Sequence, residues 1–191
     1  MRTDPPCVIL AGGQARRMGG IDHVIERLRP QCGALAINAN GDPSRFAALG
    51  LPVLPDPVPG QPGPLAGILA AMEWATALGA GHVVTVAADT PFLPRDLVSR
   101  LVAAASPGGA VAESPDGTGR FRAHPTFGLW PVGLRDRLAQ TIAGGERRLG
   151  VWASGVGAAR VAFGSDPVDP FFNVNTPEDL AAAERLVTIS G

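Results

Sequence analysis

Short, continuously apolar runs alternate along the chain with longer stretches that have helical spacing. A run that is apolar at successive positions is typical of a strand buried on both faces of a parallel sheet. These runs predict strands at residues 7–10, 34–38, 52–54, 82–87, 110–113, 126–130, 160–162 and 171–174. The stretches between them predict helices at residues 22–28, 43–49, 66–77, 94–105, 133–143 and 177–187. The alternation predicts an α/β fold with three layers and a mostly parallel central sheet.

Length and composition fit one folded domain. The chain has 191 residues, and a domain has roughly 100–200 residues. A hydrophobic share of 46% and a mean hydropathy of +0.16 indicate a folded chain. The formal net charge of −1 lacks the basic excess typical of proteins that bind nucleic acid or membrane surfaces. We therefore expect a single domain over residues 1–191, with neither a nucleic-acid nor a membrane partner.

The cysteines and the first residues predict a cytoplasmic protein. Cys7 and Cys32 have neither CxxC nor metal-ligand spacing, which indicates free thiols in a reducing compartment. The N-terminal stretch is not typical of a signal peptide, because residues 4–6 (DPP) interrupt it before a short apolar run. The apolar stretch at residues 65–88 contains Glu73 and two glycine breaks, so it predicts a buried helix, a turn and a strand rather than a membrane span.

Paired glycines and arginines follow the first predicted strand, in the stretch CVILAGGQARRMGG from residue 7 to residue 20. In α/β sheets ligands bind beyond the carboxyl ends of the strands, so residues just after each strand are candidates for a site. Gly12 and Gly13 allow a sharp turn whose N–H groups form an anion-binding nest. A plain turn explains the glycines equally well, but the guanidinium groups of Arg16 and Arg17 favour a phosphate site.

Asp89 follows the apolar strand predicted at residues 82–87. A carboxylate at that buried position has to be solvated or paired. Mg²⁺ is commonly held by one or two carboxylates together with substrate phosphates. The position therefore predicts Asp89 as a Mg²⁺ ligand, with a capping role as the alternative.

Asparagines stand after two further predicted strands. Asn38 and Asn40 alternate onto one face, where an amide could bind a base or a ribose, although turn chemistry explains them as well. Asn173 and Asn175 lie on one side of the last predicted strand end. The Thr176 that follows has the position of a helix N-cap. Capping accounts for that threonine but not for the asparagines.

Taken in order, the stretches LAGGQARRMGG, INAN, VLPD, GPLAG, AADTPFLP, HPT, GERR and NVNTPEDL resemble the molybdenum cofactor guanylyltransferases, the MobA proteins. Each motif is weak alone, but the ordered set spans nearly the whole chain. The resemblance implies a Rossmann-like nucleotidyltransferase fold and transfer of GMP from GTP to molybdenum-molybdopterin, with pyrophosphate released. It further implies Mg²⁺ as the cofactor, and molybdopterin-delivering proteins and apo-molybdoenzymes as partners to expect.

The resemblance also assigns roles to individual residues. It divides the chain into a nucleotide-binding part at about residues 7–105 and a molybdopterin-side part at about residues 106–187. It implies Arg17 and Asp89 as catalytic residues, with Asp89 also the metal ligand. The positions implied to bind the nucleotide are Leu10, Ala11, Gly12, Gly13, Asn38, Asp56 and Asp89. The positions implied to line the pterin side are Gly63, Gly67, His124, Arg147, Asn173 and Asn175.

One departure from the family concerns lysine. In the family an Asp-Lys pair and a short connection follow the RMGG motif, whereas here Gly20 runs directly into Ile21, and the chain contains no lysine at all. The connection is either truly deleted from the protein, which would weaken GTP binding, or it is present in the protein and missing only from these 191 residues. The second interpretation is favoured, because a deletion is expected to leave the first helix poorly joined to its strand.

Three rival functions stay open from the residues alone. A related transferase could use CTP, or charge a sugar phosphate. A protein from another class could bind molybdopterin and pass it on without catalysis, and a true loss of the lysine would favour that carrier. The stretches LAGG and NVNTP favour the guanylyl branch by resemblance.

Overall fold

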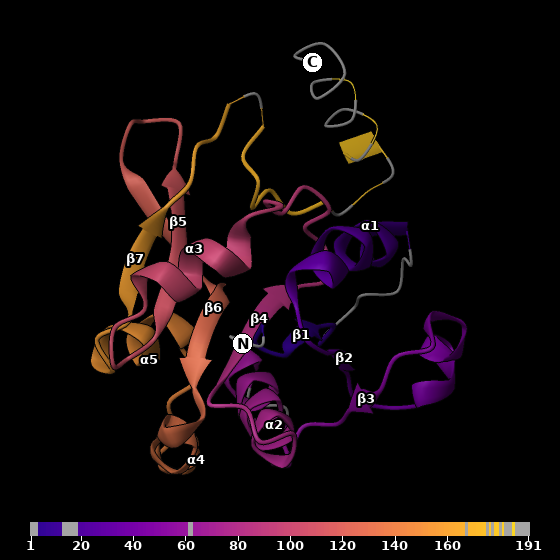
Figure 1. Ribbon diagram of the computed structural model, residues 1–191, viewed down its shortest axis with the longest axis vertical. Helices are drawn as coiled ribbons and strands as arrows, with labels where there is room; N and C mark the ends of the chain where they lie inside the picture. The colour runs from indigo at the N-terminus through magenta and orange to yellow at the C-terminus, as the bar shows by residue number, and fades with distance from the viewer. Residues whose placement is uncertain are drawn as a thin grey trace.

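The computed structural model describes residues 4–12, 19–60, 63–166, 168–174, 176, 178–179, 181 and 185. Strands and helices alternate along the chain, as the apolar runs predict (Figure 1). The strands are β1 (Cys7–Leu10), β2 (Leu35–Asn38), β3 (Val53–Leu54), β4 (His82–Ala87), β5 (Ala110–Pro115), β6 (Phe121–Pro131) and β7 (Ala159–Ala162). The α-helices are α1 (Gly19–Leu28), α2 (Pro64–Ala77), α3 (Leu97–Ala104), α4 (Arg135–Ala143) and α5 (Leu149–Gly155), and the 3-10 helices are η1 (Arg29–Gln31), η2 (Pro43–Leu49) and η3 (Val132–Leu134).

The described strands form one seven-stranded sheet in the order β3-β2-β1-β4-β6-β5-β7. Strands β1 to β4 run parallel, and β5 pairs in parallel with β7. Strand β6 is antiparallel to both of its neighbours, β4 and β5. The sheet is therefore mostly parallel, as predicted, and the carboxyl ends of every strand except β6 share one edge.

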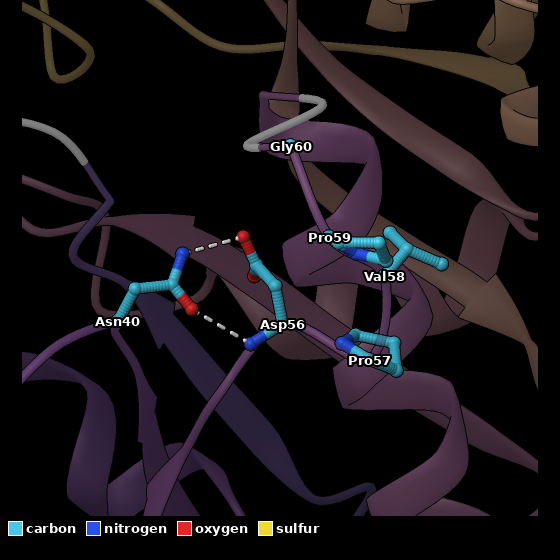
Figure 2. A pocket seen from close by; sticks show the side chains of 6 residues that line it. All are labelled: Asn40, Asp56, Pro57, Val58, Pro59 and Gly60. Carbon is cyan, nitrogen blue, oxygen red and sulfur yellow. Dashed lines mark hydrogen bonds between the residues drawn. The ribbon is translucent and has the colours of Figure 1, made fainter.

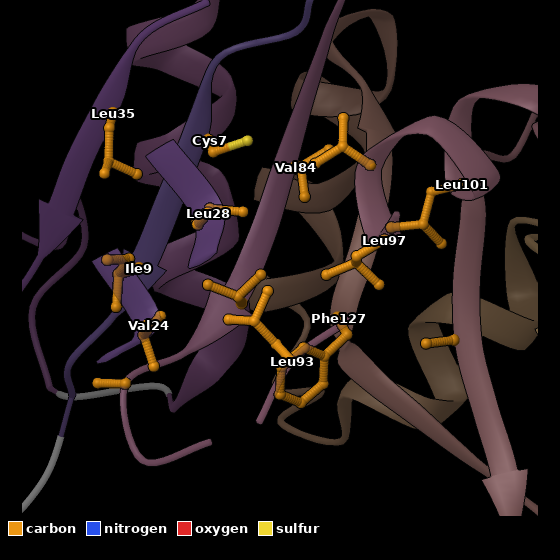
Figure 3. Close-up of a cluster of buried hydrophobic side chains, with 14 of the residues drawn as sticks. Cys7, Ile9, Val24, Leu28, Leu35, Val84, Leu93, Leu97, Leu101 and Phe127 are labelled. Carbon is orange, nitrogen blue, oxygen red and sulfur yellow. The ribbon is translucent and has the colours of Figure 1, made fainter. Parts of the chain in front are cut away.

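Helices cover both faces of the sheet. On one face α1 and α3 bury their apolar sides against the strands, where Leu28 and Leu97 pack with Ile9 and Val84 (Figure 3). On the other face lie α2, α4 and α5, and Trp152 of α5 belongs to that second cluster. These side chains are almost fully buried, so each face contributes its own core and the three-layer prediction is confirmed.

Helix α2 begins sharply because of the two residues at its start. Gly63 adopts a φ of 74°, which favours glycine, and Pro64 occupies the first helical turn. The helix then turns almost every side chain of its first half inward. Its N-terminus consequently stands at the carboxyl edge of the sheet, just after β3.

Three predictions need correction. Residues 171–174 form no strand: Asp169 accepts the N–H of Phe171 at 3.0 Å, which starts a turn, and the chain then crosses the sheet edge. Helix α5 is not among the predicted helices, because the glycines in its sequence obscure the helical spacing of its three buried residues. Strand β6 begins five residues early, at Phe121, because it pairs with β5 in a hairpin.

The end of the described chain carries one confirmed cap. Thr176 Oγ1 accepts the N–H of Asp179 at 3.1 Å, and Asp179 Oδ2 accepts the N–H of Thr176 at 3.0 Å. This reciprocal pair is a capping box. Most of the helix predicted at 177–187 lies outside the described residues. No helix within the described part of the chain is long and apolar enough to cross a membrane.

Candidate active site at the carboxyl edge of the sheet

The turns after β1, β2 and β4 are held together by backbone hydrogen bonds. Ala11 N–H donates to Asn38 at 2.9 Å, and Ala88 N–H donates to Leu10 at 3.3 Å. Gly12 lies just beyond, exposed, and a Cβ added to it would meet nothing within 4 Å. The backbone of this turn is therefore accessible to a ligand, as the sequence predicts.

An amide–carboxylate cluster lies beside that turn. Asn38, which is 3% exposed, donates its Nδ2 to Asp56 Oδ1 at 2.9 Å and to the Leu54 carbonyl at 3.0 Å. Asn40 donates its Nδ2 to Asp56 Oδ2 at 2.7 Å and accepts the Asp56 N–H at 2.9 Å (Figure 2). The cluster borders an open pocket of about 390 Å³, lined by Asn40, Asp56, Pro57, Val58, Pro59 and Gly60. Asn38 and Asp56 are thus brought together, and Asn40 joins them.

Gly67 belongs to this cluster by packing. A Cβ at this position would lie 2.4 Å from Asn38 Oδ1 and 3.0 Å from Leu10 Cδ2. The missing side chain therefore lets α2 approach the amide of Asn38. The resemblance implies Gly67 on the pterin side, whereas the structure places it against Asn38 and Leu10, two residues that the resemblance assigns to the nucleotide. Gly63 is exposed at the start of the same helix.

Asp89 lies two residues after β4, half-buried, next to the segment that crosses the sheet edge. Its backbone carbonyl accepts the N–H of Val174 at 2.8 Å. The buried hydroxyl of Thr90 lies 3.5 Å from Asp89 Oδ1 and 3.3 Å from Asn173 Oδ1. The structure thus brings Asp89 and Asn173 together although they are far apart in the sequence.

A second polar cluster surrounds His124 on β6. The Oγ of Ser114, which is 1% exposed, lies 2.8 Å from His124 Nε2 and 3.0 Å from Asp169 Oδ1. The imidazole stacks on Phe171, with ring centroids 4.7 Å apart. Burial lowers the pKa of His124, Asp169 acts to raise it, and the charge of Arg122 acts to lower it further.

Arg147 lies at the corner between α4 and α5. Its guanidinium donates to the carbonyls of Ile142 and Glu146, both at 2.8 Å, so it closes the C-terminus of α4. Hydrogen bonds from Arg148, and from the N–H of Arg147, lower the pKa of Glu146 to about 2. Among the described residues, no hydrogen bond, ion pair or ring contact joins this corner to His124, which stacks against the core on the other face.

Three residues implied by the resemblance lie outside the described residues: Gly13, Arg17 and Asn175. Within the described ranges, no group of three or more histidine, cysteine or acidic side chains could together hold a metal ion. The oxygen atoms that contacts place beside Asp89 are those of Thr90 and Asn173. Sequence reasoning missed Ser114, Asp169 and Thr90, although Ser114 follows a predicted strand and Thr90 follows Asp89, which are the positions where a site is expected.

A mostly parallel sheet with an exposed glycine turn, an amide–carboxylate pocket and the carboxylate of Asp89 along one edge has the layout of α/β proteins that bind ligands beyond the carboxyl ends of their strands. Residues 7–155 match a family model described as the MobA-like NTP transferase domain. The chain belongs to this family.

Individual relatives agree with that assignment. A protein of Bradyrhizobium sp. (strain ORS 278) named "Molybdenum cofactor guanylyltransferase" is 48% identical over 206 residues, covering 98% of this chain and 95% of its own length. A crystal structure titled "Molybdopterin-guanine dinucleotide biosynthesis protein A" from Archaeoglobus fulgidus has a TM-score of 0.63 at 21% identity, covering 96% of this chain and 99% of its own. A 4-diphosphocytidyl-2C-methyl-D-erythritol synthase reaches 0.70 at 15% identity, covering 98% and 99%. The structural matches show the fold alone.

The alignment also bears on the missing connection. It spans 206 positions although this chain has 191 residues, so the Bradyrhizobium protein has residues opposite gaps in this chain. Helix α1 is well packed, with Ile21 4% exposed and Val24 and Leu28 fully buried. The connection from β1 to α1 at residues 13–18 lies outside the described residues, so the expectation of an omitted connection stays a prediction.

Proposed function

We propose that this protein transfers GMP from GTP to molybdenum-molybdopterin, giving molybdopterin guanine dinucleotide and pyrophosphate. The observation that carries the proposal is the 48% identity over nearly the whole chain to a relative named for this activity. The geometry supports it, because three groups of predicted site residues lie along one edge of the sheet. We further propose a division into a nucleotide part at about residues 7–105 and a molybdopterin part at about residues 106–187.

The nucleotide would bind over the turn after β1 and the pocket beside β2. The turn of Leu10, Ala11, Gly12 and Gly13 would approach its phosphates, and Gly12 is exposed there. Asp56 is suited to the nucleoside, since a carboxylate accepts N–H or O–H donors of a base or a ribose. Asn38 holds that carboxylate in place through its 2.9 Å hydrogen bond. Arg17 would stabilise charge on the pyrophosphate leaving group.

The residues present fit a Mg²⁺ ion of the kind that bridges substrate phosphates. Such an ion keeps several waters and needs only one or two carboxylates from the protein. Asp89 supplies one carboxylate at the carboxyl end of β4, and Thr90 and Asn173 add oxygen atoms beside it. Bound there, Mg²⁺ would neutralise phosphate charge; Asp89 is the residue that would hold it.

The acceptor would bind beyond Asp89, toward His124 and Asn173. Asn173 is exposed beside Asp89, so it stands between the two proposed substrates. Asn175, Arg147 and Gly63 are proposed to line this side from further away. We assign Gly67 to the support of the nucleotide pocket, on the strength of its contact with Asn38.

For this reaction the protein has to position the two substrates and neutralise the phosphate charge. In-line displacement at the α-phosphorus needs two oriented substrates and stabilised charge, without a protein nucleophile. These 191 residues contain no lysine, and arginine is the cationic side chain they offer to the phosphates. We propose a cytoplasmic enzyme that receives molybdopterin from delivering proteins and passes its product to apo-molybdoenzymes.

Pyrophosphate release with GTP or CTP tests the proposal. Purified protein, Mg²⁺ and molybdenum-loaded molybdopterin should release pyrophosphate with GTP and only weakly with CTP. Release with CTP alone would assign the protein to the cytidylyl branch, which the fold does not distinguish. Molybdopterin binding with no release from either nucleotide would indicate the non-catalytic carrier that a true loss of the lysine would favour.

A further inference from the structure

The hydroxyl of Ser114 fixes where the proton of His124 lies. A serine hydroxyl has one hydrogen to donate, and a carboxylate can only accept. Asp169 Oδ1 already accepts the N–H of Phe171 at 3.0 Å and accepts from Ser114 Oγ at the same distance. The Ser114 hydroxyl therefore donates its hydrogen to Asp169 Oδ1. Its oxygen accepts a hydrogen bond from His124 Nε2 at 2.8 Å. Nε2 carries the proton.

The other ring nitrogen of His124 is then a free acceptor. In a neutral imidazole with Nε2 protonated, Nδ1 carries a lone pair. No hydrogen bond to Nδ1 occurs within the described residues. Trp152 Nε1 is the one buried side-chain nitrogen or oxygen lacking a partner in that part of the chain, so Nδ1 is open to solvent.

The surroundings keep the imidazole neutral and fixed in orientation. Phe171 stacks on one face of the ring. The charged groups that act on it are Asp169 and Arg122, of opposite sign, and partial burial lowers its pKa. Arg122 is exposed and has no ion pair among the described residues. His124 thus presents a fixed hydrogen-bond acceptor at the edge where Asp89 and Asn173 lie.

We propose that His124 Nδ1 accepts a hydrogen bond from an N–H donor on the heterocycle of the acceptor substrate, and that Ser114 and Asp169 are positioning residues that set this tautomer. The inference rests on the proposed function for the identity of that substrate. Pterin rings carry amide and amino N–H groups, which suit an acceptor nitrogen. A protonated imidazole, or the opposite tautomer, would present a donor there and oppose binding.

The tautomer can be read directly by ¹⁵N NMR of protein labelled at histidine. The chain has three histidines, so a His124→Gln spectrum assigns the signals. At pH 7.5 the wild type should show a protonated Nε2 and an unprotonated Nδ1. Asp169→Asn should keep this pattern, because an amide Oδ1 still accepts from Ser114 and Phe171. Ser114→Ala and Asp169→Ala should shift both signals toward a mixture of tautomers.

Kinetics separates positioning from folding. Losing one hydrogen bond to substrate should raise the KM for molybdenum-molybdopterin by about tenfold in Ser114→Ala and Asp169→Ala. The KM for GTP should stay unchanged, and Asp169→Asn should restore most of the loss. Ser99→Ala removes an exposed serine hydroxyl on α3 and should leave both constants unaltered. A merely structural role would raise both constants together.

Two results would overturn the inference. One is a wild-type spectrum with Nδ1 protonated at pH 7.5. The other is a correct spectrum in which molybdenum-molybdopterin binds without moving the Nδ1 signal. Failure of the proposed function looks different, because the wild type would then release no pyrophosphate while the tautomer, which needs no substrate, could still be measured.

Discussion

Replacing Gly67 by alanine should damage the nucleotide pocket through a single atom. The new Cβ would lie 2.4 Å from Asn38 Oδ1, where ordinary contact begins at 3.4 Å, so the amide has to move by about 1 Å. Asn38 is 3% exposed, and such a shift breaks its 2.9 Å and 3.0 Å hydrogen bonds to Asp56 and Leu54. These bonds contribute about 1 kcal/mol for the carbonyl and about 1.5–3 kcal/mol for the carboxylate.

Alanine returns part of that loss, since it favours a helix over glycine by about 0.5–1 kcal/mol. The free energy of unfolding should therefore fall by about 2–3 kcal/mol, which lowers Tm by roughly 5–10 °C in a chain of this size. Urea unfolding measures the first quantity and calorimetry the second. The KM for GTP should also rise severalfold, because Asp56 loses the hydrogen bond from Asn38 and keeps only those with Asn40.

Gly150 offers a matched control in a helix. It lies in α5, exposed, and an added Cβ would meet nothing within 4 Å. Gly150→Ala should be neutral or stabilise by up to about 1 kcal/mol. The reasoning about the contact with Asn38 fails if Gly67→Ala is as stable as Gly150→Ala and binds GTP as the wild type does.

Three further outcomes are expected. Asp89→Asn should reduce pyrophosphate release by at least about 100-fold, the scale of lost metal-assisted charge stabilisation, with an unchanged urea midpoint; near-normal release would contradict its role. Thr85→Val should lower the free energy of unfolding by about 1–3 kcal/mol, because Trp130 Nε1 donates to Thr85 Oγ1 at 2.9 Å in a fully buried position; an unchanged urea midpoint would argue against it. The folded-state pKa of His124 lies below its ordinary value of 6.5, so the unfolded chain binds the proton first and stability should fall as pH drops below 6.5. His124→Gln should flatten that slope in urea titrations from pH 7.5 to pH 5, and an equal slope in both proteins would refute the assignment.

The pattern of apolar and polar residues along the sequence predicts most of the strands and helices. The start and end of β1 and β4 follow from apolar runs that are buried on both faces. The pattern failed where pairing or turns decide the structure. Phe121 starts β6 only because β5 lies beside it, and Phe171 leaves the strand geometry because Asp169 caps a turn.

The candidate site was predictable at the level of strand ends and unpredictable at the level of contacts. Asp89 stands out as a carboxylate after a buried strand, which sequence shows directly. The hydrogen bond between Ser114 and Asp169 joins residues 55 positions apart, so no local sequence pattern predicts it. The position of Gly67 against Asn38 likewise depends on how α2 packs on β2, and no sequence motif predicts that packing.

Identification of the reaction product tests the central claim most directly. The protein should be incubated with GTP, Mg²⁺ and molybdenum-molybdopterin, and the pterin products should be separated and weighed by mass spectrometry. The account predicts molybdopterin guanine dinucleotide, formed in equal amount to pyrophosphate by the wild type and lost in Asp89→Asn. Unmodified molybdopterin recovered from the wild type, or a cytidylyl product formed in preference when CTP is also present, would contradict it.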